Sequence, residues 1–425
     1  MPHPTKRDFL RGAAAVAGAV ALAPLAGLEQ AFAAVAHVPA PDLARNEDFW
    51  ARLRRQYALP GNFTQLENGY YSLQSVPVLE AYIAQVRRIN ALSSYYMRTA
   101  KDDDKLAVRA ELARLLGCAP DTVIITRNTT ESLDTVIAGR DWQQGDEAVM
   151  AEQDYGAMLD MFALMKRRYG TVNRVVSLPM DPASDDEIVQ LYEGAMSPRT
   201  KLLMVCQMVN ITGQVLPIAK ITAMAHRHNV EVMVDGAHAF AQLDFRLDDL
   251  GPVDYYATSL HKWLGTPLGA GLLYVRPDRI APLWPVFADM GFADTDIRKL
   301  NHTGTHPVAT DLAIRDAIRF HDAIGITRKS ARLRWLQRYW TDQVRGHPRI
   351  VLNTPTAPER SGAIANVGVG GVKPAELAKR LMEQYRIFTV AIDGAKVHGV
   401  RVTPQLFTTT KELDLFVKAL KEIAA

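Results

Sequence analysis

Two ionisable side chains near the middle of the chain place an amine and a carboxylate where ligands commonly bind. Asp235 follows the apolar run 231–234, and Lys262 comes shortly after a second run, Val253 to Thr258. Both runs predict buried strands of a parallel sheet, whose ligands bind beyond the carboxyl ends of the strands. We therefore expect the two side chains to face one pocket. Taken singly, Asp235 would be a helix cap and Lys262 a surface lysine.

An amine and a carboxylate in one pocket suit pyridoxal 5'-phosphate (PLP). This cofactor needs an amine to hold it as a Schiff base and a carboxylate at its pyridine nitrogen to keep the ring protonated. Ser259 and His261 add groups that can bind phosphate beside the lysine.

The order V-D-G-A-H, with the lysine of S-L-H-K 24 residues after the histidine, resembles the class V aminotransferase group of fold-type I PLP enzymes. That group includes isopenicillin-N epimerase, the cysteine desulfurases and kynureninase. The resemblance implies that Lys262 forms the Schiff base, Asp235 pairs with the pyridine nitrogen and His238 contacts the ring hydroxyl, while Ser259 and His261 hold the phosphate. Desulfurases usually have glutamine at the position of His238, so this form is typical of the epimerase branch.

Two segments upstream extend the expected cofactor site. Thr129 and Thr130 follow the predicted strand Thr122 to Thr126 and open a helix, whose N-terminus is an anion site. Capping by Asn128 or Thr129 alone would also explain the pattern, but the resemblance implies that both threonines bind the PLP phosphate. By the same resemblance Tyr155 covers the pyridine ring, with simple packing as the alternative.

Three further residues are expected to face substrate or cofactor. Asn210 lies in a turn similar to the family's H-V-x-N-x-T-G-Q, which implies a place near the cofactor hydroxyl and the substrate. Arg401 resembles the arginine that grips the substrate α-carboxylate through two charge-assisted hydrogen bonds, although it could be a surface arginine on an edge strand. Asn68 lies in the turn Leu66 to Ser72, which resembles the family's L-N-x-G-x-x-S/G. The residues of this turn, Glu67 and Asn68 among them, could touch substrate, or the turn could be purely structural.

Thr305 concerns a partner subunit. It lies in a segment that resembles the W-T-G-T loop of the epimerase branch, which reaches the phosphate of the partner subunit. The resemblance therefore implies a homodimer. His306 and Pro307 replace the Arg-Asp pair of that loop, and we do not assign them its roles.

Composition argues against several other functions. The chain of 425 residues is 48% hydrophobic and 22% charged, and its net charge of +3 is too small to indicate a nucleic-acid partner. Cys118 and Cys206 give neither a disulfide framework nor the spacing of metal ligands, so no metal is expected. Cysteine desulfuration needs a mobile cysteine near the substrate arginine, and no cysteine follows Cys206.

Strand and helix patterns alternate from about residue 120 to 275, which predicts an α/β fold. The resemblance implies fold-type I, with a mostly parallel seven-stranded sheet flanked by helices and a smaller α+β C-terminal domain. We expect a large PLP-binding domain at 61–320 and a small domain at 321–425. Arginine-rich helices at 308–345 predict a solvated face.

The N-terminus predicts export. Thr5 to Arg11 precede an alanine-rich apolar segment, and Ala31-Phe32-Ala33 offers a cleavage site, so residues 1–33 resemble a twin-arginine (Tat) signal in which Lys6 replaces the first arginine. Residues 34–60 form an N-terminal segment. The apolar segment is too short and too weakly hydrophobic for a permanent membrane span. These features predict a periplasmic or secreted protein that uses the Tat export machinery, with a general secretory signal as the alternative.

The combined expectation is an exported PLP enzyme that acts on the amino group or Cα of an amino acid or peptide-like metabolite, in the manner of an aminotransferase or epimerase. Exported family members resemble the periplasmic PLP enzyme of pyoverdine maturation, so an oxidative or decarboxylating change to the glutamate of a siderophore precursor is one alternative. A catalytically inactive PLP-fold binding protein and an α/β binding protein without PLP are others. The residues leave the substrate and the reacting bond open.

Overall fold

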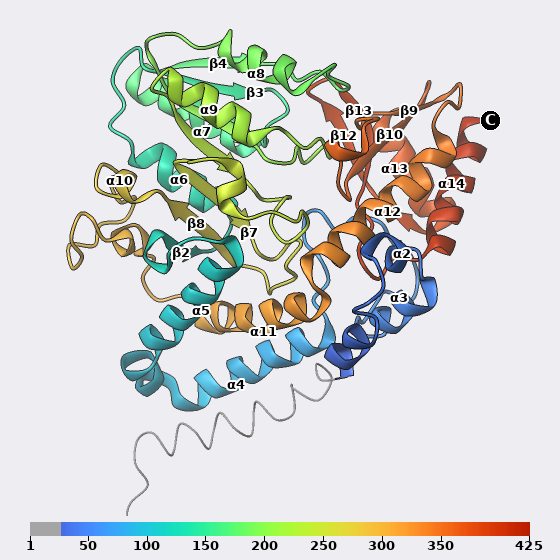
Figure 1. The fold of residues 1–425 in the computed structure, drawn as a ribbon, viewed down its shortest axis with the longest axis horizontal. Coiled ribbons are helices and arrows are strands. Elements are labelled where there is room, and N and C mark those ends of the chain that lie inside the picture. Colours follow the sequence, from blue (N-terminus) through green and yellow to red (C-terminus); the bar gives the residue numbers. More distant parts are fainter. Residues whose placement is uncertain (1–26) are drawn as a thin grey trace, which may run out of the picture.

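The structure, a computed structural model, describes residues 27–425, which fold around a seven-stranded sheet (Figure 1). The strand order is β2-β8-β7-β6-β5-β3-β4, and every strand runs parallel except β8, which is antiparallel to both neighbours. The predicted mostly parallel α/β sheet is thus confirmed. Its strands are β2 (Val123–Thr126), β3 (Glu147–Ala151), β4 (Val172–Val176), β5 (Thr200–Cys206), β6 (Glu231–Asp235), β7 (Tyr255–Ser259) and β8 (Gly271–Val275).

Helices cover both faces of this sheet because its central strands are apolar on both sides. Along β5, Leu203 and Val205 belong to one hydrophobic core, and Leu202 and Met204 belong to the other, as the two-residue period of a strand requires. The helices that contribute to the first core include α4 (Val76–Thr99), α5 (Lys101–Leu116), α8 (Asp185–Glu193), α9 (Ile218–Arg227) and α11 (Val308–Ile324), and those of the second are α6 (Thr129–Gly139), α7 (Gly156–Tyr169) and the short α10 (Pro277–Ile280).

The C-terminal part of the chain forms the expected smaller α+β unit beside the large sheet, drawn in orange and red in Figure 1. Its antiparallel sheet has the order β12-β13-β10-β9 and packs with helices around a separate core. The elements are α12 (Ile326–Val344), β9 (Ile350–Leu352), β10 (Ala365–Val369), α13 (Pro374–Tyr385), β11 (Ile387–Phe388), β12 (Val390–Gly394), β13 (Val397–Val402) and α14 (Thr410–Ala424).

A segment from the N-terminal half joins this smaller unit. The short strand β1 (Thr64–Gln65) pairs in parallel with β11. The Leu66 amide then donates to the Phe388 carbonyl at 3.1 Å, and the Thr403 amide donates to the Leu66 carbonyl at 2.7 Å. This pairing carries the residues after Leu66 to the end of β13.

The arginine-rich segment 308–345 forms the predicted solvated face only in part, since Arg319 and Arg338 have side chains that are 46% and 40% exposed. Helix α11 runs beside α4 (Figure 1) and buries residues on several sides, including Ala313, Ile314 and Ala317. On α12, Arg332 is 1% exposed and lies 5.4 Å from the Trp50 ring centroid. The prediction was wrong for Arg332 because an arginine stem packs well when its guanidinium finds acceptors, here the carbonyls of Ala44 and Thr408.

The predicted export signal lies mostly outside the described residues. Residues 27–34 are helical, and Phe32, within the predicted cleavage site, is 2% exposed with its ring 4.9 Å from that of Phe49. The following helices, α2 (Ala40–Ala44) and α3 (Glu47–Arg54), lie against α12 and its surroundings (Figure 1). Among residues 27–425, no helix has both the length and the apolar character that a membrane crossing needs.

Candidate active site

Three neighbouring strands deliver polar groups to one edge of the large sheet. Cys206 at the end of β5 pairs in register with Asp235 at the end of β6, and Asp235 pairs with Ala257 on β7. The turns that follow these strand ends carry Asn210, His238 and Lys262. Because the strands are parallel, their carboxyl ends meet at one place, as ligand sites of open α/β sheets require.

Lys262 and His238 are in direct contact. The Lys262 Nζ lies 3.2 Å from the His238 Nε2, and the Trp263 indole N–H donates to the His238 Nδ1 at 3.4 Å. An indole N–H can only donate, so the His238 Nδ1 is an acceptor and the proton of the neutral imidazole lies on Nε2. His238 is 4% exposed, and burial together with the charges of Lys262 and Arg401 holds its pKa well below the usual value. The neutral ring therefore turns an N–H toward the lysine.

The surroundings of Lys262 shift its amine toward the neutral form. Burial is the main cause that lowers the pKa of Lys262 to about 8, the nearby Asp235 carboxylate opposes the shift, and Arg401 adds to it. An amine with such a pKa is a nucleophile near neutral pH, as Schiff-base lysines must be.

Asp235 is a buried acid with few partners inside the protein. One oxygen, Oδ1, accepts from the Ala237 amide at 2.9 Å, and Oδ2 lies 3.9 Å from the Cys206 sulfur. Burial raises the pKa of Asp235, while the charge of Lys262 opposes the shift. A cationic ring N–H at Oδ2 would compensate for the lost hydration, which is the role expected for this residue in a PLP site.

The start of α6 forms an anion cradle with the end of β7. The Thr129 amide donates to the Ser259 Oγ at 2.9 Å, and the two hydroxyl oxygens lie 2.7 Å apart. Asn128 performs the ordinary cap by accepting from the Glu131 amide, which confirms the capping interpretation for this residue. The phosphate-binding role of the two threonines stays a prediction. Thr130 is the second residue of α6. The structure thus brings Thr129 and Ser259 together beside a positive helix terminus.

His261 lies between Ser259 and Lys262 and is largely buried. Burial and the adjacent lysine lower the pKa of His261 to about 4. The ring is therefore neutral at pH 7 and contributes a hydrogen bond rather than a charge to an anion.

On the substrate side, Arg401 is already paired. Its Nε and Nη2 donate to the two carboxylate oxygens of Glu67 at 3.0 and 2.7 Å, and its Nη1 donates to the Asn210 carbonyl at 3.2 Å. Asn68 donates through Nδ2 to the Thr403 carbonyl at 2.8 Å. The structure therefore brings Arg401, Asn68 and Asn210 together, but the fork of the arginine is occupied.

Two acceptor oxygens in this group lack a partner within the described residues. They are the buried Oδ1 atoms of Asn68 and Asn210. Buried polar atoms are normally hydrogen-bonded, so their positions fit a site that a bound molecule completes. Together with the Lys262 amine, the Asp235 carboxylate and the Ser259–Thr129 cradle, the donor set fits PLP.

The two remaining predicted residues are placed less centrally. Tyr155, which is 43% exposed, directly precedes α7, and its backbone lies near the Cys206 thiol beside Asp235. Thr305 is exposed and lines a separate cavity of about 680 Å³ with Lys105 and Arg109. No contact joins Thr305 to Lys262 in the part of the chain described here, so its role toward a partner subunit stays a prediction.

Three more residues belong to the site. The sequence placed Glu67 only within a turn that could touch substrate, and it assigned no role to Trp263 and Asp154. Glu67 stands where the family motif L-N-x-G has asparagine, and this departure was the available signal. Trp263 directly follows the reactive lysine. Asp154 is 5% exposed, and burial raises its pKa to about 7 next to Cys206 and Asp235; nothing in its local sequence separates it from an ordinary turn residue.

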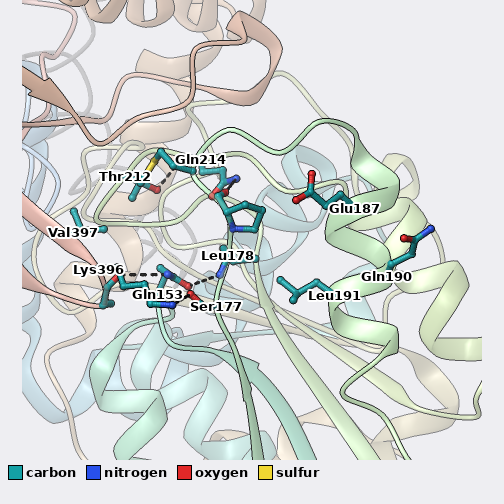
Figure 2. A pocket seen from close by; sticks show the side chains of 13 residues that line it. Gln153, Ser177, Leu178, Glu187, Gln190, Leu191, Thr212, Gln214, Lys396 and Val397 are labelled. Atoms are coloured by element: carbon teal, nitrogen blue, oxygen red, sulfur yellow. Dashed lines mark hydrogen bonds between the residues drawn. The ribbon is translucent and has the colours of Figure 1, made fainter.

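A second cavity of about 620 Å³ lies beside the site, between the large domain and the β12–β13 turn (Figure 2). Gln153 spans it by donating to the Ala395 carbonyl at 3.3 Å and accepting from the Leu178 amide at 3.0 Å. Lys396 donates to the Ser177 hydroxyl at 2.6 Å. None of the predicted site residues lines this cavity, so it is a neighbour of the site and not its centre.

Comparison with known proteins decides the family. The model of the family described as Aminotransferase class-V matches residues 72–413, which include all the predicted site residues except Asn68. The chain belongs to the class V aminotransferase family. Its cofactor is therefore pyridoxal phosphate, and it is a PLP-dependent enzyme of that family.

Curated relatives and solved structures agree with this placement. The chain is 30% identical over 394 residues to isopenicillin N epimerase from Amycolatopsis lactamdurans, covering 88% of this chain and 98% of the relative. It is also 30% identical to the epimerase from Streptomyces clavuligerus, covering 73% of this chain and 82% of that protein. A variant of C-DES with glycine covalently linked to PLP superposes with a TM-score of 0.79 at 22% identity, covering 86% of this chain and 98% of that one. The cysteine desulfurase CsdA from Escherichia coli gives 0.76 at 23% identity, covering 88% and 98%. These two likenesses concern the fold.

Proposed function

We propose that this class V enzyme moves a proton at the Cα of an amine substrate, in an aminotransferase- or epimerase-like reaction. The observation that carries the proposal is the Lys262 amine, whose pKa is lowered to about 8 and which touches a neutral His238 at 3.2 Å. When bound, PLP supplies the electron sink that weakens a bond at the substrate Cα. The protein supplies the base and its orientation.

Each group has a stated task in this proposal. Lys262 would hold the cofactor at rest, and its free amine would take or return the Cα proton of a bound substrate. His238 would orient the Lys262 amine through Nε2, and Asp235 would favour a protonated pyridine nitrogen. Thr129 and Ser259 would hold the phosphate end, so that the reacting bond keeps one orientation.

Desulfuration fits the chain less well than a proton transfer at Cα. Burial raises the pKa of Cys118 to about 11, and Cys206 is 2% exposed with its pKa well above the usual value. Neither thiol is a ready thiolate, which is the nucleophilic form of cysteine.

Deuterium exchange tests the proposal. The PLP-loaded enzyme is incubated in D₂O with a panel of amino acids, amino-acid amides and short peptides, and mass spectrometry follows deuterium at Cα. We expect exchange with at least one class of amine, and none with Lys262→Ala. Cofactor binding without exchange in any amine would contradict the proposal and favour an inactive binding protein.

We further propose that the protein is exported in the folded state and works as a homodimer. The N-terminal sequence pattern supports export, and the likeness of the segment around Thr305 to a dimer loop supports the second subunit. Fusion of residues 1–40 to a reporter tests export, since a reporter that stays in the cytoplasm contradicts it. Light scattering tests the dimer, since a PLP-loaded monomer contradicts it.

A further inference from the structure

The substrate end of the site contains an internal carboxylate where a substrate carboxylate would be expected to bind. Glu67 and Arg401 have side chains that are 5% and 8% exposed, and two charge-assisted hydrogen bonds of 3.0 and 2.7 Å join them. These are the two parallel donors with which an arginine recognises a carboxylate. Arg401 also influences the pKa of both Lys262 and His238, so the pair belongs to the reacting site.

Glu67 is held firmly in this position. Its Oε1 also accepts from the backbone amides of Gly69 and Tyr70, both at 2.9 Å. The preceding residue, Leu66, is also held through its backbone, because its amide donates to the Phe388 carbonyl and its carbonyl accepts from the Thr403 amide. A substrate carboxylate that displaced Glu67 would have to break its two bonds to Arg401 and leave a buried charge unpaired, which is strongly unfavourable.

The charges of Arg401 and Glu67 also disfavour the binding of a free substrate carboxylate. Arg401 and Glu67 together are neutral, so a free α-carboxylate would find no uncompensated positive charge on this pair. What remains on the Arg401 guanidinium is one N–H on Nη1 beside its bond to Asn210, and one on Nη2. These donors suit a neutral carbonyl oxygen.

The unpartnered amide oxygen of Asn68 favours a ligand that can donate a hydrogen bond. Among residues 27–425 the buried Asn68 Oδ1 has no hydrogen-bond partner, and the orientation of the amide is assigned from the bond that Nδ2 donates to the Thr403 carbonyl. A carboxylate has no hydrogen to offer this oxygen, whereas an amide N–H has one. Next to Glu67 and Arg401, the site therefore offers acceptors for an amide nitrogen and donors for an amide oxygen.

We infer that the substrate carries its reacting amino group next to a neutral amide and not next to a free carboxylate, as in an amino-acid amide or the N-terminal residue of a peptide-like metabolite. Glu67 is then a residue that determines specificity, because it neutralises the arginine that would otherwise select free amino acids. The inference rests on the proposed function, since it names the substrate class of the same site.

Titration of the holoenzyme with matched ligands tests the inference. A panel of L-amino acids and the corresponding L-amino-acid amides is added to the PLP-loaded protein, and changes in the cofactor absorbance give apparent dissociation constants. We expect at least one amide to bind wild-type enzyme about tenfold or more tightly than its acid, a factor that corresponds to about 1.4 kcal/mol. Glu67→Gln should reduce this preference at least about tenfold, since loss of a charged hydrogen-bond partner has effects of this size.

A matched control uses another glutamate that is paired with arginine. Glu231 bonds Arg140 and stands at the opposite end of β6 from Asp235, so Glu231→Gln should leave the preference unchanged. Melting temperatures of both variants show whether they fold. If Glu67→Gln does not fold, the ratio of the dissociation constants of the acid and the amide in the wild-type enzyme decides alone.

Several results would overturn the inference. They are equal or tighter binding of the acids to wild-type enzyme, an unchanged preference in a folded Glu67→Gln variant, and a spectrum that no amide perturbs. Failure of the proposed function looks different, because amides would then perturb the spectrum without Cα deuterium exchange. A protein without a cofactor band that depends on Lys262 would contradict the proposed function itself.

Discussion

The acidity of the Lys262 amine is the quantity on which the proposed chemistry most depends. Its pKa of about 8 lies below the ordinary 10.5 chiefly because the amine is buried. At pH 7 about 9% of the amine is then neutral, against about 0.03% for an ordinary lysine, a gain of about 300-fold in nucleophile. Asp235 acts in the opposite direction by stabilising the ammonium form. Asp235→Asn should therefore lower the pKa of Lys262 further.

Competitive acetylation of the cofactor-free protein measures this pKa. The rate at which the peptide with Lys262 reacts with acetic anhydride is followed by mass spectrometry as a function of pH. We expect a midpoint near pH 8 in the wild-type protein and a lower one in Asp235→Asn, with Lys262→Ala identifying the peptide. The reasoning is refuted by a wild-type midpoint near 10.5, or by an Asp235→Asn midpoint that stays the same or rises.

Three further substitutions test single contacts. Trp263→Phe removes the N–H that donates to the His238 Nδ1, so this nitrogen can carry the ring proton and Nε2 can accept from the lysine ammonium. The pKa of Lys262 measured by acetylation should therefore rise. A change smaller than the error of the assay would contradict the assigned tautomer of His238. The pKa of Asp154 is raised from 3.8 to about 7 by burial, so as pH rises the unfolded chain loses this proton first and stability falls between these values. Asp154→Asn should therefore raise the free energy of unfolding by up to about 4 kcal/mol at pH 8 and hardly at pH 4. Melting temperatures at the two pH values measure this difference, and an equal change at both would contradict the raised pKa. A Cβ at Gly236 would lie 2.0 Å from the Tyr256 hydroxyl oxygen, so Gly236→Ala should cost about 1–3 kcal/mol in a denaturant titration and weaken PLP binding; wild-type values for both would show that Tyr256 moves freely.

Much of the large domain could be predicted from local sequence. The ends of β6 and β7 follow from apolar runs that stop at Asp235 and at Ser259, and parallel pairing then brings those ends together. The reversed direction of β8 could not be predicted, because an apolar run such as Leu272 to Val275 carries no sign of strand direction.

The pairing of Glu67 with Arg401 was beyond sequence reasoning for another reason. It joins residues 334 positions apart and exists because β1 pairs with β11, two strands of two residues each. Such short strands have no periodic pattern to detect. The sequence indicated that Arg401 could bind a carboxylate, but only the fold shows that the protein supplies that carboxylate itself.

The central claim is that PLP is bound covalently at Lys262, and reduction with borohydride tests it most directly. The PLP-loaded protein is reduced, digested and analysed by mass spectrometry. The account predicts the mass of the reduced cofactor on the peptide that contains Lys262, and no such adduct after Lys262→Ala. An adduct on a different lysine, or none in a protein supplied with PLP, would contradict the account.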